Sequence, residues 1–269
     1  METFIRDHEG SAYVRALASS DLASRLKLGQ AEFFWGKAVA VYDEPEKISA
    51  SRERTDIHLS SRLAPHFDRV DQELIIFSPY FVPGKKGVEY LADICRRGIR
   101  VRVLTNSLAS TDVSLVHAGY SRYRKALLRA GVELYELDKK ISRQEKKKKK
   151  GKLGASKASL HTKSFVLDRK QVFIGSLNLD PRSVIENTEI GLILDSPEIG
   201  RGMGEWFDTH VDKIAIELEL RQNQTGPDQI RWHRQEDGKN KVYLRDPHTS
   251  FFKRLGIDLL GMLPIESQL

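Results

Sequence analysis

The most informative residues lie in one stretch of eighteen positions, from His161 to Asn178. His161 and Lys163 are two residues apart in a run that is typical of a β-strand, so we expect both side chains on one face of that strand. Core packing explains such a pair poorly, because lysine is seldom buried without a partner. A turn follows, and the next predicted strand ends at Gly175 and Ser176, where glycine lets the backbone approach a ligand.

These side chains are suited to a phosphate group. Lys163 supplies positive charge, while Ser176 and Asn178 supply hydrogen-bond groups. His161 can attack phosphorus or move a proton. Glu189, on the strand that follows, is a candidate to hold the second nitrogen of the imidazole. The stretch therefore predicts a pocket at the ends of adjacent strands that binds a phosphate oxyanion.

The elements that must position these residues follow an alternating pattern. Short apolar runs, which are typical of buried strands, alternate with segments that have the period of amphipathic helices. This alternation predicts an α/β fold with a layered sheet of about seven strands. The predicted strands span residues 38–42, 73–77, 99–104, 132–137, 161–167, 171–174 and 188–194, the helices span residues 56–71, 87–97, 120–130 and 196–216, and residues 230–233 and 242–245 form a hairpin.

Composition excludes several classes of protein. Cys95 is the one cysteine, so the chain forms neither an internal disulfide nor a zinc site built from several cysteines. No stretch reaches the ~18 apolar residues that a membrane span needs. The net charge is +7, but residues 139–157 hold ten basic residues and one acidic residue, so the rest of the chain sums to −2. This distribution argues against binding to a nucleic-acid duplex, which needs many phosphate contacts.

The spacing of these residues resembles the signature of the phospholipase D superfamily. That signature reads His-x-Lys-x4-Asp-x6-Gly-Ser-x-Asn, and this chain matches all six fixed positions. The resemblance implies a phospholipase D-type fold, with a mixed sheet flanked by helices on both faces. It also implies a phosphohistidine intermediate and no metal or other cofactor.

The resemblance assigns roles residue by residue. It implies that His161 is the general acid and base and that Glu189 orients it and raises its pKa. Asp168 resembles a structural residue of the motif, bonded near the strand turn. The implied catalytic set is His161, Lys163, Asp168 and Glu189, and the implied phosphate-binding set is Gly175, Ser176 and Asn178.

A finer resemblance is to bacterial cardiolipin synthases. It rests on residues 78–83, on residues 175–183 and on the acid at Glu189, while residues 105–112 and 116–120 are similar to the enterobacterial third-type branch. This similarity implies a phosphatidyltransferase whose substrates are phospholipids such as phosphatidylglycerol. It further implies a peripheral protein on the cytoplasmic side of a bacterial inner membrane, where the lysines of residues 146–150 attract anionic lipid.

Members of that family carry two such motifs, and this chain has one. We therefore expect residues 1–36 to be a connector from an N-terminal half, residues 37–220 to be the catalytic domain, and residues 221–269 to be an extension with a possible interfacial helix. The partner is then the N-terminal half of the same enzyme or a second copy. Two alternatives stay open: a phosphodiesterase or nuclease active as a homodimer, and a non-catalytic half that binds a membrane or a partner.

Overall fold

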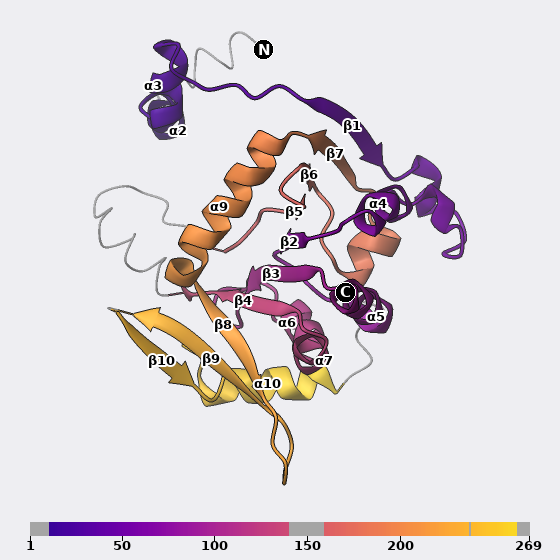
Figure 1. Cartoon of the computed structure of the whole chain (residues 1–269), viewed down its shortest axis with the longest axis vertical. Coiled ribbons are helices and arrows are strands. Elements are labelled where there is room, and N and C mark those ends of the chain that lie inside the picture. Colours follow the sequence, from indigo (N-terminus) through magenta and orange to yellow (C-terminus); the bar gives the residue numbers. More distant parts are fainter. Residues whose placement is uncertain (1–10, 140–158, 237, 263–269) are drawn as a thin grey trace. The chain divides into compact units, whose positions relative to one another are not determined.

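The computed structural model describes residues 11–139, 159–236 and 238–262, which divide into two compact units between Trp35 and Gly36. The described part of the first unit holds two short helices, α2 (Ala12–Ala18) and α3 (Asp21–Lys27) (Figure 1). Each helix begins after a serine whose hydroxyl accepts a hydrogen bond from a backbone N–H in the first turn. These caps satisfy donors that a helix start otherwise leaves unpaired.

The second unit is built on one mixed sheet, which has ten strands within the described residues. Strands β2, β3 and β4 run parallel, and the other neighbouring pairs are antiparallel. The order across the sheet is β1-β7-β6-β5-β2-β3-β4-β8-β9-β10. The strands are β1 (Lys37–Tyr42), β2 (Glu73–Phe77), β3 (Arg100–Asn106), β4 (Glu133–Leu137), β5 (Ser164–Leu167), β6 (Gln171–Gly175), β7 (Ile190–Asp195), β8 (Ala215–Arg221), β9 (Gln229–Glu236) and β10 (Lys239–Tyr243).

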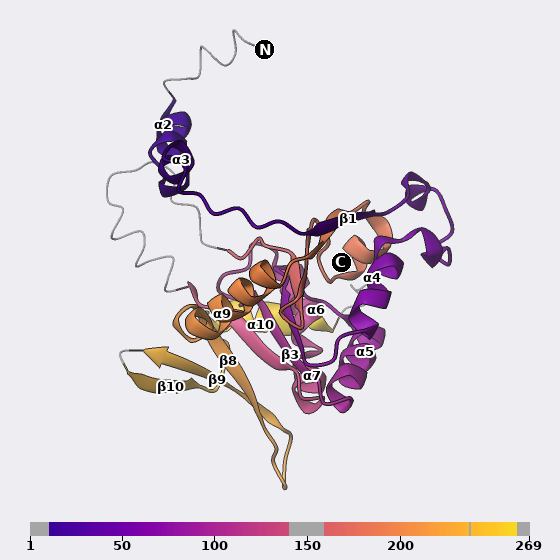
Figure 2. The same ribbon diagram turned by 45° about the horizontal axis from the view of Figure 1, so that its top comes forward.

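The sheet is larger than the predicted seven strands because β8, β9 and β10 extend it at one end (Figure 2). The predicted hairpin is β9 and β10, in which Trp232 pairs with Tyr243. Strand β8 was missed, and the helix predicted over residues 196–216 runs into it. Residues 216–220 alternate Ile or Leu with Glu, which is the period of a half-buried strand rather than of a helix.

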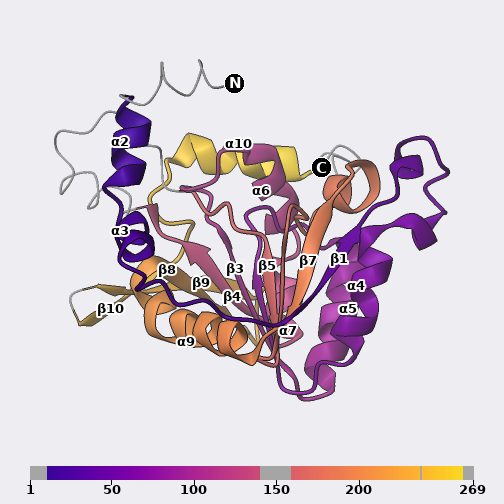
Figure 3. The ribbon, with the colours of Figure 1, turned by 90° about the horizontal axis from the view of Figure 1, so that it is seen from above.

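Helices cover both faces of the sheet, as predicted (Figures 1 and 3). On one face, α9 packs on a cluster that includes Ile75, Phe77 and Val166. The alternate residues of the same strands, Ile76 and Phe165 among them, join the core under the other helices. The helices of this unit are α4 (Leu59–Asp68), α5 (Gly84–Arg96), α6 (Ser114–Ser121), α7 (Arg124–Arg129), α9 (Pro197–Ile214) and α10 (Phe251–Gly261), with 3₁₀-helices at Pro45–Ile48 and Thr55–Ile57 and a π-helix at Arg182–Glu186.

Two predicted helices have different bounds in the structure. The helix expected over residues 120–130 is two helices, α6 and α7, because the N–H of Tyr123 donates back to the carbonyl of Tyr120 in a tighter turn between them. The helix expected over residues 56–71 is α4, which is shorter (Leu59–Asp68) and contains Pro65. In both cases the apolar period is present, but local hydrogen bonding sets the ends.

A buried ionic cluster ties the C-terminal segment to the core. Arg124 contacts Asp246 at 2.8 Å and Glu136 at 2.9 Å, and its guanidinium also lies beside His117. Farther along, Lys253 of α10 donates to the carbonyl of Leu108 at 2.6 Å. The residues after β10 therefore pack on the same unit as the sheet.

Two further observations concern the membrane. In the described part of the chain, no helix combines the length and the apolar character that crossing a bilayer requires. The lysines at residues 146–150 lie outside the described residues.

The Asp246 cluster generates a prediction about stability. Burial alone would raise the pKa of the Asp246 carboxyl, but the Arg124 guanidinium and His117 hold that pKa well below its usual range. A depressed folded-state pKa contributes stability above the unfolded pKa of about 3.9, and this contribution falls as the pH falls below it. Asp246→Asn should therefore lower the free energy of unfolding by about 2 kcal/mol at pH 7 and by less at pH 3, measured with urea.

The matched control is Asp258→Asn, which removes a carboxylate from an exposed position of α10. It should change the free energy of unfolding by less than about 0.5 kcal/mol. Equal effects of the two substitutions at pH 7 would contradict a structural role for the cluster.

Candidate active site

The hairpin of β5 and β6 carries most of the predicted site, and Asp168 fixes its position. Asp168 lies in the turn between the strands with a φ of 51°, a conformation that aspartate tolerates better than most residues. Its carboxylate accepts hydrogen bonds from the backbone N–H groups of Asp71, Gln72 and Glu73, at 3.0, 2.8 and 2.9 Å. Asp168 thus ties the hairpin to the start of β2, at the end of β5 opposite His161.

His161 and Lys163 precede β5, although a strand was predicted across residues 161–167. The chain leaves the ladder here because the side chain of Asn106 pairs with both backbone groups of Leu160, at 2.9 and 3.2 Å. One bond continues the pairing with β6, from the N–H of Gly175 to the carbonyl of Lys163 at 3.1 Å. His161 is exposed. The two side chains are therefore set by an extended segment at the strand end and not by a regular strand.

The ammonium of Lys163 is half-buried and lies among carboxylates. It donates to the carbonyl oxygen of His161 at 3.1 Å. Burial lowers the pKa of Lys163, and the negative charges of Glu189, Asp180 and Asp112 oppose that effect. Lys163 consequently keeps a positive charge at a partly desolvated position, which suits a group that binds a phosphoryl oxygen.

Glu189 is engaged by Ser176. The Ser176 hydroxyl donates to the Glu189 carboxylate and accepts from the N–H of Ile190 at 3.0 Å. The side-chain amide of Asn187 donates to the other carboxylate oxygen at 3.4 Å. Among the described residues, neither nitrogen of the His161 imidazole has a hydrogen bond. The structure therefore places Glu189 as the partner of Ser176, where we expected it to hold His161.

A cavity of about 260 Å³ opens beside these residues, and Asn178, Asp180 and Tyr80 are among its lining side chains. Asn178 is 9% exposed, and its side-chain oxygen has no partner within the described part of the chain. Asp180 accepts from the N–H of Ser183 at 2.9 Å, and burial raises its pKa. A buried polar atom without a partner is rare, so Asn178 has hydrogen-bonding capacity left for a ligand.

A buried ion pair behind the site was missed by the sequence reasoning. Lys47 and Asp43 are 2.9 Å apart, with side chains that are 1% and 0% exposed. Asp43 accepts from the N–H of Glu189 at 2.7 Å, and Lys47 donates to the carbonyl of Ser183 at 3.3 Å. The pair thus holds the backbone on both sides of the cavity. The sequence indicates this ion pair only weakly, by an acid just after a strand and a lysine four residues later.

Asp112 and His117 have surroundings that differ from each other. Asp112 accepts from the Tyr80 hydroxyl at 2.9 Å, and burial together with this carboxylate raises the pKa of Tyr80 to about 12. His117 is buried, and burial with the Arg124 charge lowers its pKa to about 4. Asp112 is therefore bonded to Tyr80, which lines the cavity, whereas His117 belongs to the buried ionic cluster. Within the described residues, no group of three or more metal-ligating side chains is arranged to hold an ion.

Comparisons with known proteins give the family of this chain. Residues 63–211 match a family model described as cardiolipin synthase, phospholipase D-like domain. The chain is 38% identical over 254 residues to cardiolipin synthase C of Escherichia coli strain K12, covering 94% of this chain and 53% of that protein. It is 30% identical over 249 residues to an uncharacterised protein of Helicobacter pylori, covering 91% of this chain and 46% of the relative.

Among solved structures, the phospholipase D family member Nuc from Salmonella typhimurium aligns with a TM-score of 0.49 and 13% identity, over 69% of this chain and 99% of that one. The two sequence relatives differ from this chain in length. The chain spans about half the length of each of them.

The charges around Lys163 generate a second prediction. Because burial lowers its pKa, its amine should begin to react with an acylating reagent at a pH below the ordinary lysine pKa of about 10.4. Glu189→Gln removes a negative charge that stabilises the ammonium, so the pKa should fall further and the labelling midpoint should move to lower pH. Labelling across pH, read by mass spectrometry of the peptide, measures this midpoint.

The control is Glu205→Gln on the exposed surface of α9, which should leave the midpoint of Lys163 unchanged. A midpoint that is the same in Glu189→Gln and in the unmodified chain would mean that Glu189 does not act on Lys163.

Proposed function

Because this chain belongs to the cardiolipin synthase family with a phospholipase D-like domain, we propose that it supplies one half of a phosphatidyltransferase active site. The family match confirms the predicted phospholipase D-type fold. The proposed reaction moves a phosphatidyl group from one glycerophospholipid to a hydroxyl of phosphatidylglycerol, which yields cardiolipin. One observation carries the proposal: exposed His161 and half-buried Lys163 lie at the same end of the β5–β6 hairpin as Ser176.

Two histidines divide the proposed reaction into two steps. A histidine of the other half attacks phosphorus and forms a P–N bond, while the P–O bond to the leaving alcohol breaks and His161 gives that alcohol a proton. His161 then removes a proton from the incoming hydroxyl, whose oxygen attacks phosphorus as the P–N bond breaks. This is covalent catalysis with a general acid and base. Lys163 and the side-chain NH2 group of Asn178 hold the phosphoryl oxygens, and the Ser176 hydroxyl joins them when it turns away from Glu189.

The charge of the site supports a second half. The carboxylates of Glu189, Asp180 and Asp112 all raise the pKa of Lys163, so the side-chain charges that act on its ammonium from the described residues are negative. A phosphodiester is itself an anion, and binding it here requires further positive charge. The lysine of a second motif, brought by a partner, supplies that charge.

An uncovered part of the sheet supports the same proposal. Ile174, Ile190 and Leu192 are 45%, 60% and 46% exposed, and Leu192 pairs with Ile174 across β6 and β7. We call these three residues the β6–β7 patch. It begins next to Ser176, whose N–H donates to the carbonyl of Ile190. Because the chain spans half of its relatives, we propose that the other catalytic half covers this patch.

The proposed domain organisation follows from these points. Residues 1–36 serve as a connector, residues 37–220 as the catalytic domain and residues 221–269 as an extension that includes α10. Ile257 of α10 is buried, while several of its large apolar side chains are exposed, which suits a helix at a lipid interface on the cytoplasmic side. Those exposed side chains are Phe251, Phe252, Leu255 and Leu259.

A chimera tests the catalytic proposal. The region of Escherichia coli cardiolipin synthase C that this chain matches is replaced by this chain, and conversion of phosphatidylglycerol to cardiolipin is measured in mixed micelles. The chimera should be active, and His161→Ala should lower kcat by about 10²- to 10⁴-fold, the usual contribution of a general acid or base. The chain alone, assayed as a monomer, should form no cardiolipin.

His210→Ala is the matched control, because His210 is exposed on α9 and stacks on Trp206 outside the site. It should leave kcat within about twofold. An active chimera that tolerates His161→Ala, or robust activity of the monomer, would refute the proposal.

The β6–β7 patch gives a further prediction in the same chimera. Leu192→Lys places a charge where the other half is proposed to pack, so activity should fall at least tenfold, roughly 1.4 kcal/mol of lost packing. In the isolated chain the same substitution should change the free energy of unfolding little, because Leu192 is exposed there. Val242→Lys on β10 is the control, since Val242 is 44% exposed at the far edge of the sheet. Equal activity of the two variants would contradict this use of the patch.

A further inference from the structure

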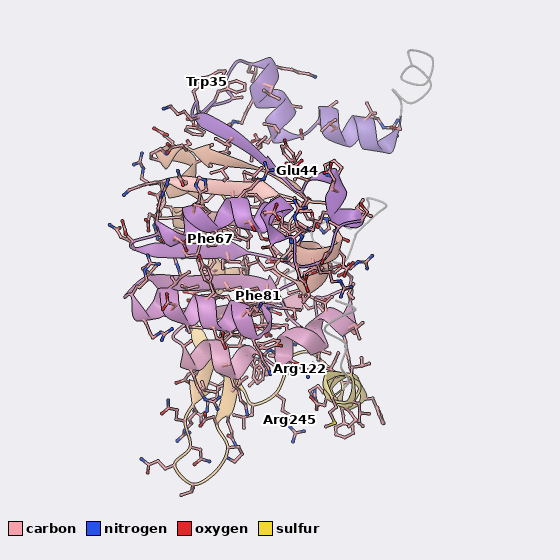
Figure 4. The ribbon with its side chains drawn as sticks, turned by 90° about the vertical axis from the view of Figure 1, so that its right-hand side faces the viewer. Trp35, Glu44, Phe67, Phe81, Arg122 and Arg245 are labelled. Atoms are coloured by element: carbon pink, nitrogen blue, oxygen red, sulfur yellow. The ribbon has the colours of Figure 1, made fainter. Side chains whose placement is uncertain are left out.

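We propose that a large apolar cavity between α4 and α5 holds one acyl chain of the glycerophospholipid substrate, an inference that rests on the proposed function. The cavity has a volume of about 680 Å³. Its floor is formed by Ile76 and Phe165 of the sheet, and Phe67 and Phe81 line its walls (Figure 4). This volume is within the range of pockets that bind small molecules.

An apolar cavity lowers the stability of a fold when nothing fills it. Phe81 and Phe165, which are 1% and 0% exposed, are among its lining residues, so the cavity lies directly against the packed core. An empty apolar cavity forgoes the dispersion contacts that close packing would provide. Its apolar walls also offer water few hydrogen-bond partners. A hydrocarbon chain restores those contacts and needs no polar partner.

The cavity adjoins the phosphate site. Asp180 lines both the apolar cavity and the 260 Å³ polar cavity that contains Asn178. Its charge also acts on the Lys163 ammonium. Asp180 therefore borders both spaces, so a lipid whose phosphate lies in the polar cavity can place a hydrocarbon chain in the apolar one.

The rim of the cavity has the charge that a membrane lipid requires. Lys85 and Lys86, at the start of α5, line the cavity and are both exposed. Lysines at such a rim attract the phosphates of neighbouring anionic lipids. Apolar walls inside and lysines outside match an acyl chain that enters from an anionic bilayer surface.

Binding of soluble lipids to the full chain tests this proposal without turnover. The probes are dibutanoyl- and dihexanoyl-phosphatidylglycerol below their micellar concentrations, with glycerophosphoglycerol as the headgroup alone, and Kd is measured by calorimetry. Two added methylenes buried in the cavity should tighten binding about tenfold. Ala64→Trp places an indole in the cavity from an exposed position of α4, and it should abolish this difference while leaving the Kd of glycerophosphoglycerol unchanged.

Gly202→Trp is the matched control, because Gly202 is exposed on α9 with open space around it. It should keep the tenfold difference. A second measurement needs no variant: a phosphatidylglycerol with a diazirine at the end of one acyl chain should label peptides that contain residues 63–67 or 177–185. Affinity that is independent of chain length, or labelling confined to other peptides, would overturn the proposal.

The chimera separates this inference from the proposed function. An active chimera in which Ala64→Trp leaves the KM for dihexanoyl-phosphatidylglycerol unchanged would overturn the acyl-chain site and leave the phosphatidyltransferase standing. An inactive chimera, with chain-length-dependent binding that Ala64→Trp removes, would support the acyl-chain site and refute the proposed reaction.

Discussion

The arrangement of the site depends on one carboxylate that does no chemistry. Asp168 accepts three backbone hydrogen bonds from the start of β2, and a charged acceptor makes such bonds stronger than neutral ones. These bonds hold the β5–β6 hairpin against the parallel strands of the sheet. The open end of that hairpin then places Lys163 just before β5 and Ser176 just after β6. If the turn at Asp168 shifted, every group of the proposed phosphate site would shift with it.

The opposite end of the hairpin is organised by carboxylates as well. Glu189 holds Ser176, and Asp43 holds the backbone of Glu189, with Lys47 neutralising Asp43 inside the core. A buried ion pair is seldom a net source of stability, but its hydrogen bonds place neighbouring groups with little freedom. The consequence is a site whose groups are held in place, which is compatible with our proposal that a second motif contributes a further lysine.

The two cavities differ in the polarity of the residues that line them. Polar groups line the smaller cavity at Asn178, and apolar side chains line the larger one under α4 and α5. Asp180 separates them, so a molecule with a phosphate next to a hydrocarbon chain is complementary to both. The exposed apolar side chains of α10 and the lysines at the rim are features that the proposed lipid substrate would explain.

The sequence by itself determined the α/β class, the position of most strands and the residues of the motif, because apolar period and motif spacing are local properties. The resemblance of the motif also implied that Asp168 is a structural residue bonded near the strand turn. Only the tertiary structure decided that Glu189 engages Ser176, that β5 begins only at Ser164 while Asn106 pairs with Leu160, and that Asp43 and Lys47 hold the backbone of Glu189 and Ser183. Each of these is a contact between segments far apart in the chain, and no local pattern encodes which distant side chain will meet it.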